Sequence, residues 1–342
     1  MCIMLDQLIR DYDCVDKRLE LLVQWLKDQQ GLTDFSIAPA SADASFRRYF
    51  RIVSGDTSRI VMDAPPEKED CRPFIGIARM FHSMGLHVPE ILAEDLKLGF
   101  LLLSDLGDTQ YQSVLNPDSA GQLYADAMQA LSRLQTRAPT QTYPLPDYDQ
   151  ALLMREMALF TDWYLGTHLQ RQLDDRQLAI IEQAFALLCE SALAQPRVFV
   201  HRDYHSRNLM FCEDNPGILD FQDAVLGPIT YDLVSLLRDC YIAWPQAQVE
   251  QWVADYFHSL NASGLLAGIG LETFMRWFDL MGVQRHLKAT GIFARLNHRD
   301  GKPGYLQDIP RTMNYVRDVA GRYSELKDFA GLLDELSLPC FD

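Results

Sequence analysis

The chain has 342 residues, of which 48% are hydrophobic and 23% are charged, and its formal net charge is −16. This composition predicts a soluble globular protein with enough apolar residues for two lobes, and it excludes a largely disordered chain. The negative charge disfavours nucleic acids and anionic membranes as partners, and it is compatible with a cationic substrate or with an ordinary soluble enzyme.

The seven cysteines are scattered along the chain, and none forms a CxxC or Cys/His pair with metal-ligand spacing. A disulfide framework or a zinc site is therefore not expected, and reduced thiols favour a cytoplasmic protein. The first residues include acidic side chains and do not resemble a signal peptide. No stretch of 18 apolar residues is present, so a membrane span is not expected either.

Short strands dominate the first hundred residues. We expect helices over residues 15–28 and 74–84 and strands over residues 46–53, 59–62, 91–95 and 99–104. Gly31 and Gly85 end the two helices, and residues 54–57 form a turn between the first two strands. These elements predict a small β-rich α+β lobe over residues 1–104, with residues 104–108 as the linker that leads out of it.

The remainder, residues 105–342, is predicted to be a mainly helical lobe. Helical patterns cover residues 120–136, 150–166, 174–194, 230–240, 246–260, 271–295 and 323–337. A small block of strands over residues 197–201, 209–212 and 217–220 interrupts them. The overall prediction is an α+β protein with two lobes.

The strand block contains the sequence HRDYHSRN at residues 201–208. It matches the HRDxxxxN pattern of kinase catalytic loops, in which the Asp orients the attacking hydroxyl and the Asn coordinates Mg²⁺. Asp203 and Asn208 occupy these positions, and His201 is expected to be structural. Asp220, at the end of the next strand, provides a second hard oxygen ligand that suits Mg²⁺.

Asp and Asn residues also fill many solvated loops, because their side chains favour turns. The combination of strand, HRDxxxxN, strand and LDF at this spacing is more specific than any part of it, and it predicts phosphoryl transfer. Asp232 follows in the first turn of a helix. It either begins that helix well or also braces the catalytic loop.

The sequences HRDYHSRN, LDFQDA (219–224) and GPITYDLVSLL (227–237) resemble those of the aminoglycoside phosphotransferase family, which has a protein-kinase-like fold. The resemblance covers roughly residues 30–300. It implies ATP and Mg²⁺ as cofactors and a small-molecule hydroxyl as the phosphate acceptor. The first lobe would then bind the nucleotide, and the second would hold the catalytic loop and the acceptor site.

Further motifs resemble the bacterial anomeric sugar kinases of cell-wall recycling. They are ASFRRYFRI (44–52), VMDAPPEKED (61–70), LLLSDLGD (101–108), EMALFTDWYL (156–165) and the long stretch from Gln284 to Arg311. This resemblance implies phosphorylation of N-acetylmuramate and N-acetylglucosamine at the anomeric C1 hydroxyl. It also implies a role in peptidoglycan recycling in the cytoplasm, an amino-sugar substrate as the partner, and a monomeric chain.

Two features depart from the kinase pattern. The stretch at residues 41–48, where a Gly-rich loop is expected, contains no glycine, and Met62 stands where the third-strand lysine is expected. A substitute cation is then needed. Arg47, Arg48 and Arg51 are candidates, and strand alternation places Arg47 and Arg51 on one face and Arg48 on the other. All three could equally be solvated strand arginines.

The protein-kinase-like fold implies that adenine lies against the linker. Backbone groups near Leu103 and Asp105 would bind its edge, and apolar residues such as Leu101 and Val61 would enclose the ring. For the acceptor we predict Glu156 and Arg285, because a carboxylate can bind sugar hydroxyls and a cation can bind a carboxylate. Further candidates in the helical lobe are Asp162, Trp163, Asp239, His286 and Lys288.

Two alternatives stay open. A kinase of the same fold that acts on an aminoglycoside or another small metabolite would fit the negative charge. A non-catalytic pseudokinase that binds nucleotide would fit the missing lysine and glycines, although the presence of Asp203, Asn208 and Asp220 argues against it.

Overall fold

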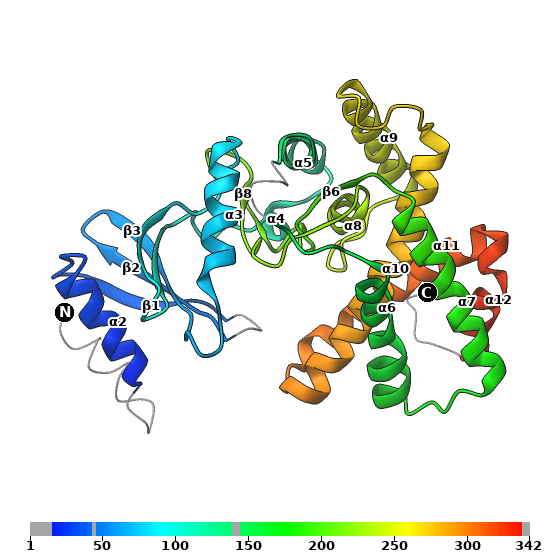
Figure 1. Cartoon of the computed structure of the whole chain (residues 1–342), viewed down its shortest axis with the longest axis horizontal. Coiled ribbons are helices and arrows are strands. Elements are labelled where there is room, and N and C mark those ends of the chain that lie inside the picture. The colour runs from blue at the N-terminus through cyan, green and yellow to red at the C-terminus, as the bar shows by residue number, and fades with distance from the viewer. Residues whose placement is uncertain (1–15, 43–45, 139–143, 337–342) are drawn as a thin grey trace. The chain divides into compact units, whose positions relative to one another are not determined.

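The computed structural model describes residues 16–42, 46–138 and 144–336 (Figure 1). Its contacts divide the chain into two compact units. The first consists of residues 1–108 and 212–222, and the second of residues 109–211 and 223–342. The lobe boundary after residue 104 stays a prediction. The contacts assign residues 212–222 to the first unit, whereas the sequence analysis placed them in the second lobe.

A five-stranded antiparallel sheet forms the centre of the first unit. Its strands have the order β1-β2-β3-β5-β4. They are β1 (Ser36–Ala42), β2 (Arg48–Ser54), β3 (Thr57–Asp63), β4 (Ile91–Asp95) and β5 (Phe100–Ser104). The sequence did not predict β1, which contains Pro39 beside a register shift. Proline is tolerated there because β1 is an edge strand, where a backbone donor can be missing.

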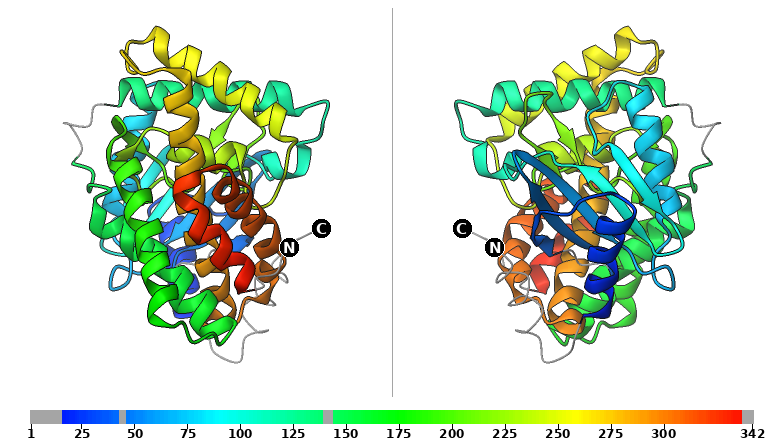
Figure 2. Two further views of the ribbon diagram at one scale, coloured as in Figure 1. Left: turned by 90° about the vertical axis from the view of Figure 1, so that its right-hand side faces the viewer. Right: turned by 90° about the vertical axis from the view of Figure 1, so that its left-hand side faces the viewer.

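Helix α2 (Lys17–Asp28) covers one face of this sheet (Figure 2). Asp16 caps the helix by accepting a hydrogen bond from the Leu19 backbone N–H at 3.0 Å. Apolar residues of the helix then recur at helical spacing and bury against alternate residues of the strands. The resulting core contains Leu19, Leu22, Trp25, Leu26, Phe50, Ile52, Val61, Phe100 and Leu102.

The segment 212–222 belongs to the first unit through two kinds of contact. The Ile218 backbone N–H, in β8 (Gly217–Ile218), donates to the His87 carbonyl at 2.8 Å. Phe221 packs against Phe74 of helix α3 (Cys71–Ser83), with ring centroids 4.9 Å apart. Asp220 is thereby fixed in the unit that carries the sheet.

Helices make up most of the second unit. They are α4 (Tyr111–Val114), α5 (Ala120–Arg137), α6 (Gln150–Leu159), α7 (Asp175–Leu193), α8 (Tyr231–Leu237), α9 (Gln246–Ala262), α10 (Leu271–Asp300), α11 (Ile309–Arg322) and α12 (Lys327–Glu335). A π-helix, η1 (Phe160–His168), continues α6, and the 3₁₀-helices η2 (Pro303–Asp308) and η3 (Ser324–Leu326) join the last helices. Among the described helices, none combines the length and apolar character that crossing a membrane requires.

The 30-residue helix α10 is the central element of this unit (Figure 1). It contacts α6, α7, α8, α9, α11, η1 and η2. It therefore buries polar as well as apolar side chains, among them Asp279, Arg285, His286 and Lys288. Helix α12 in turn lies beside α7 (Figure 2), where Arg176 and Glu335 form an ion pair at 2.6 Å.

Two short strands support the polar loop of the second unit. β6 (Arg197–Val200) pairs antiparallel with β9 (Val225–Pro228), and β7 (Leu209–Met210) begins where the loop ends. The sheet in the first unit and the helices in the second confirm the predicted α+β class, with a small β-rich part and a mainly helical part. The sequence had missed β9 and α11, and it had predicted an uninterrupted helix where α6 changes to η1.

Candidate active site

The HRDYHSRN loop, residues 201–208, is held at its start by Asp232 of helix α8. The Asp232 carboxylate accepts hydrogen bonds from the backbone N–H groups of His201, at 2.6 Å, and Arg202, at 2.9 Å. Arg202 has a positive φ of 79°, which is uncommon for a residue with a side chain. Two backbone bonds to one buried carboxylate thus stabilise a strained turn at the start of the loop.

A second buried carboxylate, Asp239, holds the far side of the loop. It accepts hydrogen bonds from the Ser206 backbone N–H at 3.0 Å and from the Ser206 hydroxyl at 2.5 Å. The Tyr204 hydroxyl is buried as well and donates to the Ala127 carbonyl at 2.9 Å. The loop is therefore anchored at three points, which limits how far its reactive side chains can move.

Asp203 and Asn208 are connected inside the loop. The Asn208 side-chain amide donates to the Asp203 carbonyl at 3.0 Å, which determines the orientation of the amide group. The Asp203 backbone N–H in turn donates to His201 Nδ1 at 3.2 Å. His201 is fully buried and contacts the Tyr204 ring edge to face. Its observed contacts are those of a residue that shapes the loop.

A cavity of about 170 Å³ opens beside Asp203, and all the residues that line it belong to the second unit. Three cations line it, Arg202, Arg285 and Lys288. Its aromatic walls consist of Tyr231, Tyr241, Phe293 and Tyr305. The cavity thus combines one carboxylate, several cations and flat apolar surfaces, which is the kind of lining that binds polar small molecules.

The cations influence the charge of Asp203. Burial alone would raise the pKa of this carboxyl group, but the positive charges of Lys288, His205, Arg202 and Arg285 outweigh that effect and hold its pKa below the ordinary value. Asp203 is therefore ionised at neutral pH, and it can accept a hydrogen bond or a proton from a hydroxyl group in the cavity.

Glu156 of α6 lies behind this cavity and connects two of its cations. It contacts the Arg202 guanidinium at 2.5 Å and the Lys288 ammonium at 3.0 Å, and it accepts a hydrogen bond from the Tyr148 hydroxyl. Although burial raises the pKa of Glu156, its neighbours Lys288 and Arg202 lower the pKa by more. Glu156 is thus an ionised carboxylate that positions the cations, and it is not among the residues that line the cavity.

Comparison with known proteins identifies the family. The model of the phosphotransferase enzyme family matches residues 36–269. The N-acetylmuramate/N-acetylglucosamine kinase of Pseudomonas putida is 50% identical over 333 residues, which cover 94% of this chain and 97% of that protein. The protein of the same name from Pseudomonas aeruginosa is 51% identical over 300 residues, covering 88% of each chain. This chain belongs to the phosphotransferase enzyme family.

The fold agrees with this assignment. The crystal structure of ADP-bound aminoglycoside phosphotransferase APH(2'')-Ib superposes with a TM-score of 0.58 and 13% sequence identity, over 87% of this chain and 98% of that chain. The predicted resemblance to this phosphotransferase family and the predicted protein-kinase-like fold with two lobes are both confirmed.

The other carboxylate predicted for this phosphotransferase, Asp220, lies in the first unit. It has a positive φ of 62°, and its carboxylate accepts a hydrogen bond from the Gln222 amide at 2.7 Å. The Arg47 guanidinium approaches it to 3.8 Å. Of the three candidate arginines, Arg47 is therefore the one that lies beside the predicted metal ligand.

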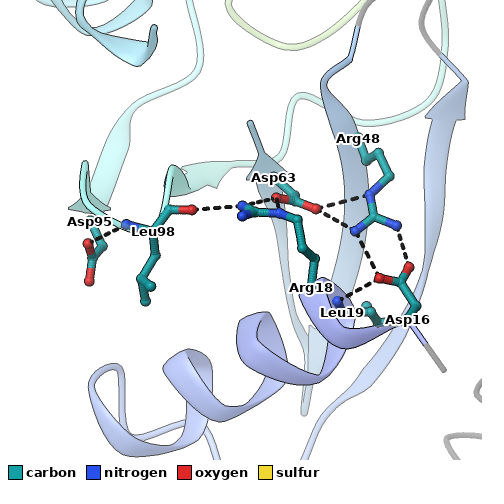
Figure 3. A network of polar contacts seen from close by, with 7 residues as sticks. All are labelled: Asp16, Arg18, Leu19, Arg48, Asp63, Asp95 and Leu98. Atoms are coloured by element: carbon teal, nitrogen blue, oxygen red, sulfur yellow. Dashed lines mark hydrogen bonds and ion pairs between the residues drawn. The ribbon is translucent and has the colours of Figure 1, made fainter. Parts of the chain in front are cut away.

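Arg48 has a different role, which Figure 3 shows. Its guanidinium and that of Arg18 both bind the buried carboxylate of Asp63, each at 2.5 Å. Arg48 also pairs with Asp16, the residue that caps α2, and Arg18 donates to the Leu98 carbonyl at 2.7 Å. The observed contacts of Arg48 thus attach α2 to the sheet. The sequence gives no signal for this network, because Asp63 in a strand looks like a surface residue.

Arg51 pairs with Asp105, at the end of the predicted linker. Its guanidinium contacts the Asp105 carboxylate at 2.7 Å and 3.1 Å. Ser58 and the Gly107 backbone N–H also donate to this carboxylate. Burial raises the pKa of Asp105, but these hydrogen bonds and the Arg51 charge lower it by more. The Asp105 side chain therefore stabilises the linker through these contacts. The predicted contact with adenine would be made by backbone groups near Leu103 and Asp105.

The prediction for Val61 needs a correction. Val61 is fully buried in the core against α2, because it lies on the same face of the sheet as Phe50 and Leu102. The opposite face carries Met62 and its neighbours on the same strand and on β5, namely Ile60, Leu101 and Leu103. Leu103 thus shares the face of the missing lysine, whereas Val61 does not.

In the second unit, Arg285 lines the cavity and Glu156 supports it, whereas Asp162, Trp163 and His286 do not line it. Arg202 also lines the cavity, and the sequence did not single it out, although it is the middle residue of the HRD motif. The sequence analysis also missed Tyr231, Tyr241, Phe293 and Tyr305. These rings come from four separate segments, so no local pattern identifies them.

Proposed function

We propose that this phosphotransferase transfers the γ-phosphoryl group of ATP to the anomeric C1 hydroxyl of N-acetylmuramate and N-acetylglucosamine. The observation that carries the proposal is the cavity in which Asp203 faces cations and aromatic rings. Two relatives that align along most of this chain are named as kinases of these two sugars, which supports the same acceptors here.

Asp203 is the proposed catalytic residue. Its carboxylate is ionised, because the surrounding cations lower its pKa, and its backbone is held by His201 and Asn208. It orients the acceptor hydroxyl and accepts its proton as the oxygen attacks the phosphorus atom. An anomeric hydroxyl is more acidic than other sugar hydroxyls, so a weak base such as a carboxylate suffices.

Oxygen donors fit Mg²⁺ as the metal. One amide from Asn208 and one carboxylate from Asp220 are hard ligands of the type that Mg²⁺ takes together with substrate phosphates. Among the described residues no cluster of three His, Cys, Asp or Glu side chains forms a dedicated metal cage. When bound, the metal ion neutralises charge on the phosphate groups. Arg47, beside Asp220, is proposed as the cation that replaces the missing lysine.

The cations of the cavity favour the sugar acceptors over an aminoglycoside. Arg202, Arg285 and Lys288 line it together with a single carboxylate, Asp203. The ammonium groups of an aminoglycoside would find a single carboxylate in this lining, whereas a neutral or acidic sugar needs none. The presence of Asp203, Asn208 and Asp220 in the sequence also disfavours a pseudokinase. We further propose a cytoplasmic location and a role in peptidoglycan recycling, where such sugars are released.

A substrate panel tests the proposal. The purified protein is given ATP, Mg²⁺ and one acceptor at a time, and the release of ADP is measured. We expect release with N-acetylmuramate and N-acetylglucosamine and none with gentamicin or choline. Asp203→Asn should reduce turnover by at least about 10³-fold and leave the circular dichroism spectrum unchanged. Turnover with an amine-bearing acceptor but with neither sugar would contradict the proposal.

A further inference from the structure

Arg285 is a buried cation without an ion-pair partner in the described part of the chain. It is 6% exposed and lies on α10, and its guanidinium lines the cavity. The hydrogen bond observed for its side chain is a weak one, from Nη1 to the Cys240 sulfur at 3.7 Å. Among the described residues, no carboxylate forms an ion pair with it at 4.0 Å or less.

The other cations of this region each have a carboxylate in direct contact. Arg202 and Lys288 share the carboxylate of Glu156. Arg238, which is as deeply buried as Arg285, pairs with Asp279 at 2.5 Å. Burial lowers the pKa of the Arg285 guanidinium, but the charges of its neighbours, Asp239 and Asp203 among them, raise it by more, so the group stays charged. Among the described cations that line the cavity, Arg285 is the one that no carboxylate contacts directly, so its N–H donors stay available to a molecule in the cavity.

The lining of the cavity is not only charged. Besides Asp203 and the cations it includes the side chains of Ile292, Phe293, Leu296 and Tyr305. Phe293 and Tyr305 are stacked, with ring centroids 5.7 Å apart and planes 17° from parallel, so each ring limits the movement of the other. A sugar ring with an N-acetyl group can pack against such aromatic side chains while a carboxylate on the sugar reaches a cation.

We propose that Arg285 binds the lactyl carboxylate, which N-acetylmuramate carries and N-acetylglucosamine lacks, and that it sets the preference for the acidic sugar. This inference rests on the proposed function. Arginine suits the task because its guanidinium can donate two parallel hydrogen bonds to a carboxylate. Lys288 is a weaker candidate, since Glu156 and the Tyr231 hydroxyl, at 2.9 Å, already occupy its ammonium group.

The test compares Arg285→Gln with the wild type on three acceptors: N-acetylmuramate, its lactyl amide, which has no charge, and N-acetylglucosamine. We expect kcat/KM of the variant to fall roughly 30- to 100-fold for N-acetylmuramate, mainly through KM, as expected when a charge-assisted hydrogen bond is lost. For the amide and for N-acetylglucosamine the fall should be at least about tenfold smaller, because any loss that acts through Asp203, whose pKa Arg285 helps to lower, is common to all three acceptors. Arg285→Lys, which keeps the charge, should recover part of the loss.

Arg311→Gln is the matched control. Arg311 also lies near Cys240, donating to its carbonyl at 3.0 Å, but it does not line the cavity. This change should affect both sugars alike. An equal loss for all three acceptors in Arg285→Gln would overturn the inference.

Two further outcomes separate the possible failures. If the Arg285→Gln variant does not fold, the kcat/KM values of the wild type still test the inference. Equal values for N-acetylmuramate and its lactyl amide would overturn it without any variant. If the wild type phosphorylates neither sugar, the proposed function itself has failed.

Discussion

Asp232 is a single buried carboxyl group that supports the HRDYHSRN loop, and its burial raises its pKa. It is fully buried, and its two hydrogen bonds come from backbone N–H groups rather than from a cation. Burial raises its pKa to about 7, although the hydrogen bonds from His201 and Arg202 act in the opposite direction. Near neutral pH, the loop is therefore held by a group that is close to its titration point.

This raised pKa predicts a pH-dependent stability. The unfolded pKa is near 3.8, so the contribution of Asp232 is fully present below about pH 4 and is lost as the pH rises through about 7. In Asp232→Asn this titration is absent. The wild type should therefore lose up to about 4 kcal/mol relative to the variant between pH 4 and 7, since one pKa unit corresponds to about 1.4 kcal/mol.

Urea unfolding of both proteins at several pH values measures this difference. The comparison also removes the effect of His286, whose pKa burial lowers to about 3 and whose contribution is lost as the pH falls. That titration is common to both proteins and cancels. A difference in free energy of unfolding that stays constant from pH 4 to 7 would contradict the assignment.

Local and distant relationships among residues differ in how well the sequence predicts them. Asp203 and Asn208 share one short loop, so their spacing alone indicates that they lie together. Arg285 reaches the same cavity only because α10 crosses the unit, and the sequence could name it only as one of several candidates. Asp63 was missed for the same reason, since its partner Arg18 comes from a distant helix.

At the scale of elements, α10 packs unusually close to the end of α6. A side chain on Gly291 would place its Cβ 2.3 Å from the Leu159 carbonyl carbon, so only glycine fits there. The π-helix η1 begins at the next residue, Phe160. π-Helical turns within helices are rare and are frequently found at functional sites. Gly291 thus permits the crossing of α10 and α6 that brings Lys288 into contact with Glu156.

Gly291→Ala should therefore destabilise the protein. The clash is with backbone rather than with a flexible side chain, and overpacking of this kind costs about 1–3 kcal/mol. The control is Gly331→Ala in α12, where a Cβ would meet no atom within 4 Å. It should stabilise the protein by up to about 1 kcal/mol, because alanine favours helices. Thermal unfolding measures both, and a Gly291→Ala variant as stable as the wild type would refute the tight crossing.

The elements that the sequence missed have identifiable physical reasons. β1 contains a proline and small residues, which do not resemble a buried strand, yet an edge strand tolerates them. β9 contains a glycine and a proline and is stabilised by its pairing with β6. α11 did carry a signal, since Pro310 stands in its first turn and Met313, Val316 and Ala320 follow at helical spacing.

At the scale of the whole molecule, the chain crosses between its two units more than once. Asp203 and Asn208 belong to the second unit, whereas Asp220 and Arg47 belong to the first through the segment 212–222. The sequence predicts two lobes from the change in pattern after the strand expected at residues 99–104. It cannot predict that a short segment returns to the first unit, because that depends on contacts such as Phe221 with Phe74.

Phosphorus NMR of the products formed from ATP and N-acetylmuramate shows which hydroxyl receives the phosphate. If the phosphotransferase acts on the anomeric hydroxyl of the amino sugar, as proposed, a new sugar 1-phosphate signal will appear, with phosphorus coupled to the anomeric proton. This signal should be absent with Asp203→Asn. A signal from a 6-phosphate, or hydrolysis of ATP without any sugar phosphate, would contradict the proposal.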